Sequence, residues 1–286
     1  MTLTGKGRIA GIIGWPVAHS LSPLLHGYWL DELGIDGAMV PLAARAEDFS
    51  RVIDGVRLAG FRGVNVTVPH KEAAFAIAHD CDAAALAAGA ANLLVFGEDG
   101  KIFARNTDAG GLAASLREKC GALDGKAAVL LGAGGAARGA VLALDELGAR
   151  TIHILNRDGG RAATLAKALA PQVRAKLVPA GRDAWPAVAP DAALLVNATS
   201  GGMTGHAPLS LDLAPLPKSA AVCDIVYNPL ETQLLKDAAA RGHATIDGLG
   251  MLMHQAAPSF EAFFGMKPAV TPGLRAALVK VLRARG

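Results

Sequence analysis

Aromatic residues are scarce in this chain, and its charges nearly cancel. Phe, Trp and Tyr make up 5% of the 286 residues, and 28 Lys and Arg stand against 25 Asp and Glu, a formal net charge of +3. Runs of basic residues interleaved with aromatics, which are typical of nucleic-acid-binding surfaces, do not occur. The composition therefore argues against a nucleic-acid partner.

Cysteine is also rare, and long apolar runs are absent. The three cysteines, Cys81, Cys120 and Cys223, are scattered, odd in number and without a CxxC spacing. This pattern excludes a disulfide framework and gives no zinc signature, so we expect no metal site. Free thiols are the rule in reducing compartments, and no stretch is long and apolar enough to span a bilayer or to form a signal peptide. We therefore expect a cytoplasmic protein with no membrane partner.

What the chain does contain is apolar residues and length. Hydrophobic residues account for 52% of the sequence and charged residues for 19%. A disordered chain has too little apolar surface to offset its ordering entropy, so this composition indicates a folded protein. At typical domain sizes the length corresponds to one large or two medium domains.

Short apolar runs alternate with helical patterns in two series. In the first half we predict strands at 8–14, 38–42 and 63–68 and helices at 22–33, 48–58, 71–78 and 82–88, followed by a hairpin with strands 93–96 and 101–104. In the second half we predict strands at 127–131, 151–155, 176–178, 194–196, 222–225 and 244–246, with helices at 136–147, 161–170, 234–241, 249–264 and 272–285. This alternation predicts an α/β protein with mainly parallel sheets.

A glycine-rich turn opens the second series. Gly132-x-Gly134-x-x-Ala137 follows a predicted strand and begins a predicted helix. The pattern G-x-G-x-x-G/A in this context is typical of dinucleotide-binding sites, where glycines allow the turn and the approach of a pyrophosphate to the helix N-terminus. We interpret this segment as a dinucleotide-binding turn.

The residues after the next strand indicate which dinucleotide is bound. NAD sites usually carry an acidic residue there, and NADP sites an arginine. Here Asn156 ends the strand, Arg157 follows, and Arg161 lies one helical turn further on. Two guanidinium groups can bind a 2′-phosphate, which favours NADP. Asp158 comes one position too late for the ribose, and we predict that it caps the next helix.

Polar residues gather where the strands of the first half end. Ser20 and Ser22 follow the first strand, Asn65 and Thr67 lie in and after the third, and Lys71 comes next. In open α/β sheets the carboxyl ends of the strands form the ligand site. Ser22 is also the expected N-cap of a helix with Pro23 at its first position, which is a purely structural alternative. Lys71 is placed unfavourably for the helix dipole, which favours a functional role.

Nine segments of the chain resemble segments of the shikimate dehydrogenase family, and they occur in the same order as in that family. They are GWPVAHSLSPLLH, NVTVPHKEAAF, GAANLLV, RNTDAGG, GAGGAARGA, NRDGGR, NATSGGM, DIVYNPLETQLL and DGLGMLMHQAA, and together they span nearly the whole chain. The resemblance implies an N-terminal α/β substrate domain and a Rossmann dinucleotide-binding domain separated by a cleft. We assign 1–108, completed by helices in 248–286, to the substrate domain and 109–247 to the NADP-binding domain.

The resemblance also implies an activity and a set of site residues. The activity is the reversible NADPH-dependent reduction of 3-dehydroshikimate to shikimate, a step toward chorismate and the aromatic amino acids. By motif, Lys71 and Asp108 form the catalytic pair. The implied substrate-binding residues are Ser20, Ser22, Asn65, Thr67, Lys71, Asn92, Asp108, Tyr227 and Gln255. The implied cofactor-binding residues are Gly132, Ala133, Gly134, Gly135, Ala136, Asn156, Arg157, Arg161, Ile225 and Gly248.

Three residues depart from the family pattern: Leu93 stands where threonine is usual, Ala109 where glycine is usual, and Arg105 where a small or acidic residue is commoner. They leave open how strictly shikimate is preferred over quinate. The alternatives are an NAD-dependent quinate/shikimate dehydrogenase, an enzyme like methylene-tetrahydrofolate dehydrogenase, and a non-catalytic NADPH-binding sensor. The sequence does not decide between a monomer and a homodimer, nor whether Lys71 alone or the Lys71–Asp108 pair accepts the proton.

Overall fold

A computed structural model describes residues 3–285, which fold into two compact units. Among the described residues, the first unit comprises 3–107 and 255–280, and the second comprises 108–254 and 281–285. Two helices, α10 (Gly248–Phe264) and α11 (Pro272–Arg285), therefore contribute residues to both units. Each unit holds one six-stranded sheet, so both expected α/β sheet domains are present.

The sheet of the first unit is mixed. Its strand order is β2-β1-β3-β5-β6-β4, with strands β1 (Arg8–Gly14), β2 (Gly37–Ala43), β3 (Gly63–Val66), β4 (Asp80–Cys81), β5 (Leu93–Phe96) and β6 (Ile102–Arg105). Strands β2, β1 and β3 are parallel, and β5 is antiparallel to both of its neighbours. The sheet therefore has parallel strands whose carboxyl ends share one edge.

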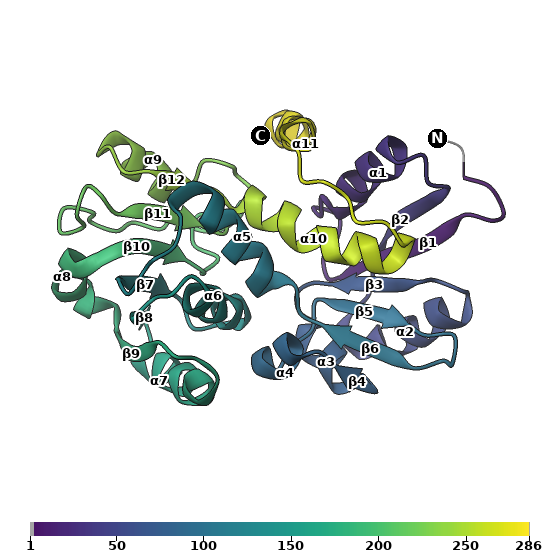
Figure 1. Ribbon diagram of the computed structural model, residues 1–286, viewed down its shortest axis with the longest axis horizontal. Helices are drawn as coiled ribbons and strands as arrows, with labels where there is room; N and C mark the ends of the chain where they lie inside the picture. The colour runs from purple at the N-terminus through teal and green to yellow at the C-terminus, as the bar shows by residue number, and fades with distance from the viewer. Residues whose placement is uncertain (1–2, 286) are drawn as a thin grey trace. The chain divides into compact units, whose positions relative to one another are not determined.

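Helices cover both faces of this sheet (Figure 1). They are α1 (Ser22–Glu32), α2 (Phe49–Leu58), α3 (Lys71–Ala76) and α4 (Ala83–Ala88), together with the part of α10 that follows His254. Phe49 and Ile53 of α2 pack with Val64 and Val66 of β3 in one apolar cluster. On α1, Trp29 packs against Phe260 of α10, with ring centroids 5.4 Å apart.

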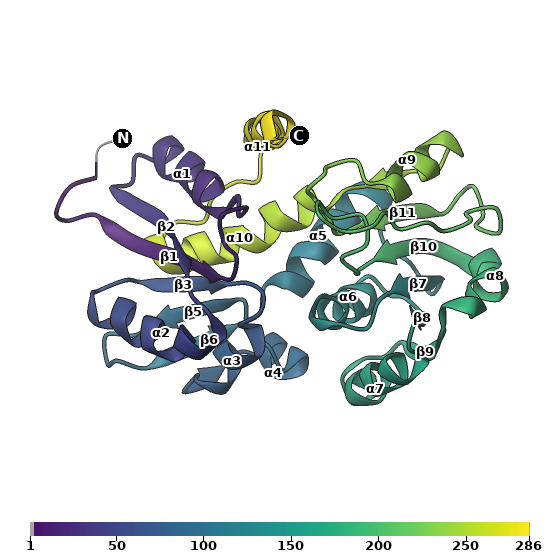
Figure 2. The same cartoon turned by 180° about the vertical axis from the view of Figure 1, so that it is seen from behind.

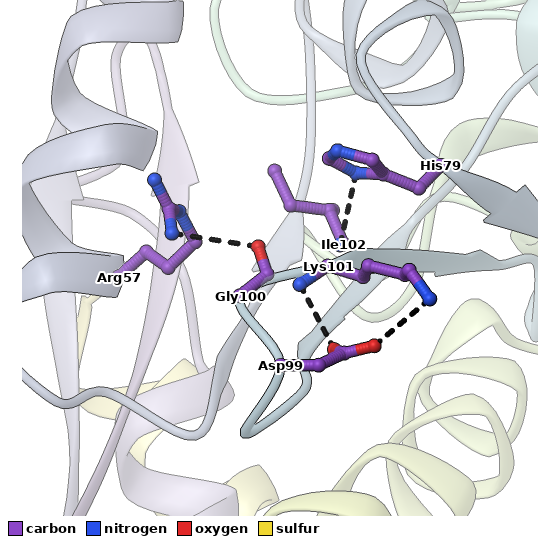
Figure 3. A network of polar contacts seen from close by, with 6 residues as sticks. All are labelled: Arg57, His79, Asp99, Gly100, Lys101 and Ile102. Atoms are coloured by element: carbon purple, nitrogen blue, oxygen red, sulfur yellow. Dashed lines mark hydrogen bonds and ion pairs between the residues drawn. The ribbon is translucent and has the colours of Figure 1, made fainter.

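The predicted hairpin is confirmed in β5 and β6 (Figure 3). Its turn places Gly100 at φ +79°, a conformation that glycine adopts without steric cost. Asp99 accepts a hydrogen bond from the Lys101 main-chain nitrogen at 3.1 Å, and its carboxylate lies 3.0 Å from Lys101 Nζ. Arg57 of α2 donates to the Gly100 carbonyl at 3.4 Å, and Ile102 N donates to His79 Nδ1 at 3.1 Å. These contacts tie the hairpin to its neighbours.

The sheet of the second unit is entirely parallel. Its strands are β7 (Ala127–Leu131), β8 (Thr151–Asn156), β9 (Lys176–Gly181), β10 (Ala192–Asn197), β11 (Ala221–Asp224) and β12 (Thr245–Ile246). The order β9-β8-β7-β10-β11-β12 is the Rossmann order 3-2-1-4-5-6, in which ligands bind at the carboxyl ends beside the central strands.

Helices of the second unit also form two layers (Figure 2). The helices are α5 (Asp108–Cys120), α6 (Gly135–Glu146), α7 (Gly159–Leu169), α8 (Trp185–Val188) and α9 (Gln233–Ala240). Residues of α5, α6 and α7 form one apolar cluster with the sheet, and residues of α8 and α9 form another. Both faces of a parallel sheet are thus buried, as its apolar strand sequences require.

A buried histidine in the first unit predicts acid sensitivity. His26 of α1 is 0% exposed and lies among the rings of Trp29, Phe260, Phe263 and Phe264. Neither of its ring nitrogens has a hydrogen-bond partner in the part of the chain that the structure describes. Burial lowers the pKa of His26 to about 3. The folded protein excludes a proton that the unfolded chain binds below about pH 6.5. The contribution of neutral His26 to the free energy of unfolding is therefore fully present above that pH and is lost as the pH falls toward 3.

We expect the free energy of unfolding to fall by about 1.4 kcal/mol per pH unit in this window from His26 alone. Urea unfolding at several pH values between about 4 and 7 measures it. The variant His26→Phe should lose this part of the slope, whereas the exposed control His206→Phe should keep it. Equal slopes for the wild type and His26→Phe would contradict the expectation.

Candidate active site

Ser20 and Ser22 lie after β1, where helix α1 begins. Ser22 is 6% exposed and is the first helical residue, followed by Pro23. The N-cap position is held by Leu21, whose side chain accepts no hydrogen bond, so the expected N-cap role of Ser22 is wrong. The Ser20 hydroxyl accepts a hydrogen bond from Ser22 N at 3.2 Å. Capping of α1 therefore does not explain the Ser22 hydroxyl, and it explains the Ser20 hydroxyl only through this one hydrogen bond.

Asn65, Thr67 and Lys71 follow one another along β3 and into α3. Thr67 N donates to the Ile13 carbonyl at 2.9 Å, which holds this segment against β1. The strands approach so closely that a Cβ on Gly14 would lie 2.4 Å from Thr67 Cγ2. Lys71 is the first residue of α3 and is half-buried. The structure thus places all three at the carboxyl end of β3, as predicted.

Asn92 and Gln255 belong to one polar network with Thr107. Asn92 Nδ2 donates to Thr107 Oγ1 at 2.9 Å and to Gln255 Oε1 at 3.2 Å, and Thr107 N donates to Asn92 Oδ1 at 2.8 Å. The Thr107 hydroxyl donates to the Gln255 carbonyl at 2.8 Å. Asn65 Nδ2 lies 3.3 Å from the Asn92 carbonyl, and Ala91 N donates to the Lys71 carbonyl at 2.9 Å. Residues far apart in sequence are thereby brought together.

Thr107 did not emerge from the sequence as a site residue. The available signal was its place inside the RNTDAGG segment, next to Asp108. Its role depends on contacts with positions 15 and 148 residues away, which no local pattern reveals.

The glycine-rich turn of the second unit has the expected geometry. Gly132 has φ +112°, and a Cβ there would lie 3.0 Å from the Ala198 carbonyl oxygen, so only glycine fits. Apart from its own neighbours in the chain and helix, a Cβ on Gly134 or Gly135 would meet no atom of residues 3–285 within 4 Å. Helix α6 begins at Gly135 with no side-chain cap. The N–H groups of its first turn, including that of Ala136, can therefore bind an anion, and Ala133 lies within the same turn.

Asn156, Arg157 and Arg161 lie at the carboxyl end of β8. Asn156 Nδ2 donates to the Asp158 carbonyl at 3.0 Å. Asp158 caps α7 by accepting from Gly160 N and Arg161 N, which confirms the predicted N-cap. Arg157 and Arg161 are exposed, and within residues 3–285 neither side chain forms an ion pair or hydrogen bond. Two guanidinium groups are thus available to a phosphate.

Ile225 and Gly248 touch each other. A Cβ on Gly248 would lie 2.1 Å from the Ile225 carbonyl oxygen, so any other residue there would displace the main chain. Gly248 N donates to the Val226 carbonyl at 3.3 Å. Tyr227, half-buried, follows in the same loop. The loop after β11 therefore packs directly against the start of α10.

A buried carboxylate that sequence reasoning missed holds this loop in place. Asp224 is 0% exposed and accepts hydrogen bonds from Asn197 Nδ2 at 2.9 Å, Val226 N at 3.1 Å and Thr232 Oγ1 at 2.7 Å. Burial raises the pKa of Asp224, and these hydrogen bonds oppose the rise. Its sequence signals were its place at the end of an apolar strand and its place as the first residue of the segment DIVYNPLETQLL.

Asp108 is the first residue of α5 and belongs to the second unit, whereas Lys71 belongs to the first. A carboxylate in the first turn complements the helix dipole. A Cβ on Gly139 of α6 would lie 3.4 Å from Asp108 Cβ, so the two helices pack closely here.

Two further features bear on the class of site. Within the described residues there is no group of three or more His, Cys, Asp or Glu side chains placed to hold a metal ion. Across the same residues, no helix has the length and apolarity needed to cross a membrane.

Family models match three segments of the chain. The substrate-binding domain of shikimate dehydrogenase matches residues 12–94, the shikimate/quinate 5-dehydrogenase model matches residues 114–199, and the C-terminal domain of shikimate 5′-dehydrogenase matches residues 248–278. The three models fall in the order of the sequence segments that resembled this family.

Individual proteins agree over nearly the full length. The NADP-dependent shikimate dehydrogenase of Rhodospirillum rubrum is 50% identical over 97% of this chain and 99% of its own. A crystal structure of shikimate dehydrogenase with NADP+ has a TM-score of 0.90 at 33% identity, covering 98% of each chain.

Two further structures carry informative ligands. The Thermus thermophilus enzyme, solved with NADP(H) and shikimate, is 35% identical with a TM-score of 0.82, covering 97% of this chain and 99% of its own. Quinate dehydrogenase from Corynebacterium glutamicum, solved with NAD, is 30% identical with a TM-score of 0.88, covering 96% and 99%. With its two sheets, its glycine-rich turn and this full-length similarity, the chain belongs to the shikimate dehydrogenase family.

Proposed function

We propose that this protein catalyses the reversible NADPH-dependent reduction of 3-dehydroshikimate to shikimate, on the route to chorismate and the aromatic amino acids. The observation that carries the proposal is the 50% identity, over 97% of the chain, to an NADP-dependent shikimate dehydrogenase. The candidate residues at the strand ends of both units supply the chemical groups that this reaction needs.

Substrate recognition falls to polar side chains of the first unit and to Tyr227. The hydroxyls of Ser20 and Ser22, with Tyr227, bind the substrate carboxylate. Asn65, Thr67, Asn92 and Gln255 bind the ring hydroxyls or hold one another in place. Support comes from the network around Asn92, which orients amide groups that would otherwise rotate.

Lys71 and Asp108 carry the proton chemistry. NADP supplies the hydride acceptor or donor when bound. In the reduction, the Lys71 ammonium group polarises the substrate carbonyl and donates a proton to its oxygen; in the oxidation, the neutral amine accepts the hydroxyl proton. Asp108 orients Lys71 and accepts a hydrogen bond from the substrate hydroxyl.

The residues present fit NADP. The open space beside Gly134 and Gly135 and the uncapped start of α6 suit a pyrophosphate. Arg157 and Arg161, with Asn156, suit the adenosine phosphate, and Ile225 and Gly248 suit the nicotinamide side. We propose 1–108 with 248–286 as the substrate domain and 109–247 as the NADP domain. A cytoplasmic location and a homodimer stay predictions.

Two alternative functions fit the residues of this chain less well. An NAD-dependent quinate/shikimate dehydrogenase would favour an acidic residue at Asn156, where this chain has none, and the arginines that follow favour a phosphate. A non-catalytic sensor would not need Lys71 and Asp108, and both are present.

Turnover of purified protein tests the proposal. With 3-dehydroshikimate and NADPH, nicotinamide absorbance should fall while shikimate appears; with shikimate and NADP+, the absorbance should rise. Binding of NADPH without turnover of either substrate would contradict the proposal and favour the sensor.

Removing the two hydroxyls should weaken substrate binding more than folding. A hydrogen bond to a charged group contributes roughly 1.5–3 kcal/mol, so Ser20→Ala combined with Ser22→Ala should raise KM for shikimate at least about tenfold. Leu21, not a serine, holds the N-cap of α1, and only the 3.2 Å hydrogen bond from Ser22 N to the Ser20 hydroxyl is lost, so the melting temperature should fall only slightly. The exposed Ser50→Ala serves as the control. A lower melting temperature with an unchanged KM would assign the serines to stability instead.

A further inference from the structure

Strand β3 directs Asn65 away from the apolar cluster under α2. Val64 and Val66 belong to that cluster, and side chains alternate along a strand, so Asn65 lies on the opposite face. On that face it meets α10 of the same unit: Ser259 contacts Asn65, and Phe263 would lie 2.7 Å from a Cβ on Gly63. Asn65 and Ser259 are 5% and 0% exposed.

Both hydrogens of the Asn65 amide nitrogen are used within the first unit. Nδ2 donates to Ser259 Oγ at 2.7 Å and to the Asn92 main-chain carbonyl at 3.3 Å. A carbonyl only accepts, so the amide nitrogen, not the amide oxygen, must face Asn92. These two acceptors fix the orientation of the amide.

The fixed orientation leaves Asn65 Oδ1 as a buried acceptor without a partner among the described residues. Leu93, which is opposite Asn65 in the β3–β5 register, has an apolar side chain that offers no donor. A buried acceptor without a donor loses its hydration and gains nothing in return, and such groups in native proteins call for an explanation. A ligand hydroxyl would supply the missing donor.

The hydroxyl of Ser259 is not explained by helix formation. Alanine has the higher helix propensity, and a hydroxyl buried in a helix needs a partner. Its contact with Asn65 provides one. The Ser259 hydroxyl therefore holds the amide in the orientation that the Asn92 carbonyl selects.

We propose that Ser259 is a positioning residue that holds the Asn65 amide so that Oδ1 accepts a hydrogen bond from a ring hydroxyl of the substrate. This inference rests on the proposed function, because it takes a polyhydroxylated ring as the ligand. It assigns Asn65 the role of acceptor only, and it adds a residue of α10 that need not touch the substrate.

A double-mutant cycle in the full-length protein tests the inference. Losing a neutral hydrogen bond costs about 0.5–1.5 kcal/mol, so Ser259→Ala should raise KM for shikimate about 2–12-fold, with kcat and KM for NADP+ nearly unchanged. In the Asn65→Ala background, Ser259→Ala should add nothing to that KM. Ser259→Thr, which keeps the hydroxyl, should stay near the wild type. The buried helix serine Ser115→Ala is the matched control.

The outcomes separate the two claims. An unchanged KM in Ser259→Ala, or the same increase in the Asn65→Ala background, would overturn the inference while the wild type still oxidised shikimate. Absence of shikimate oxidation by the wild type would overturn the proposed function and this inference with it. If Ser259→Ala does not fold, Ser259→Cys, with a weak sulfur acceptor of similar size, is expected to show the same increase.

Discussion

Replacing Lys71 with alanine is expected to lower kcat about 10²–10⁴-fold, the range typical of a lost general acid–base group. Lys71 donates the proton in the reduction and accepts it in the oxidation, so both directions should slow together. The dissociation constant for NADPH should stay near the wild-type value, since the glycine-rich turn and the arginines belong to the other unit. Steady-state turnover and NADPH fluorescence titration measure the two quantities.

The neighbouring residue provides the control. Glu72 lies exposed in the same first turn of α3, and Glu72→Ala should retain turnover. Asp108→Asn should also impair turnover, because it removes the charge and one acceptor. Near-wild-type turnover in Lys71→Ala would remove Lys71 from the mechanism.

Replacing Arg157 and Arg161 with serine should weaken the binding of NADPH strongly and leave the binding of NADH almost unchanged. Charge-assisted hydrogen bonds contribute roughly 1.5–3 kcal/mol each, which is about ten- to a hundredfold in affinity for each arginine. NADH lacks the 2′-phosphate, so it loses none of these bonds. Dissociation constants of both cofactors for the wild type and the double variant give the comparison.

The same strand supplies a matched control. Arg150 is an exposed arginine immediately before β8, at the end opposite Asn156, and Arg150→Ser should leave both affinities unchanged. Added salt should weaken NADPH binding in the wild type more than in the double variant, because an exposed phosphate site is screened. If the double variant lost no affinity for NADPH, the arginines would not contact the 2′-phosphate, and the assignment of NADP as the cofactor would be wrong.

Much of the fold follows from local patterns. Alternating apolar runs and amphipathic stretches predicted the two series of strands and helices. The glycine-rich turn indicated a Rossmann domain, and the second sheet has the strand order of that fold. The turn at 97–100 predicted the hairpin of β5 and β6. Strand β4, Asp80–Cys81, was missed because two residues carry no periodicity and the strand exists only by pairing with β6.

The candidate site divides in the same way. The positions of Ser20, Thr67 and Lys71 after strands, and of Asn65 near the end of β3, were predictable from the apolar runs that precede them, and their binding roles stay predictions. Thr107, Ser259 and Asp224 were not predictable, because their roles come from hydrogen bonds to residues distant in sequence.

Substrate and cofactor choice are best measured together, as a matrix of kcat/KM for shikimate and quinate, each with NADP+ and NAD+. We expect shikimate with NADP+ to give the highest value, and we expect the replacement of NADP+ by NAD+ to lower it at least about tenfold, because the contacts to the 2′-phosphate are lost. A highest value for quinate with NAD+ would show instead that the enzyme is an NAD-dependent quinate dehydrogenase.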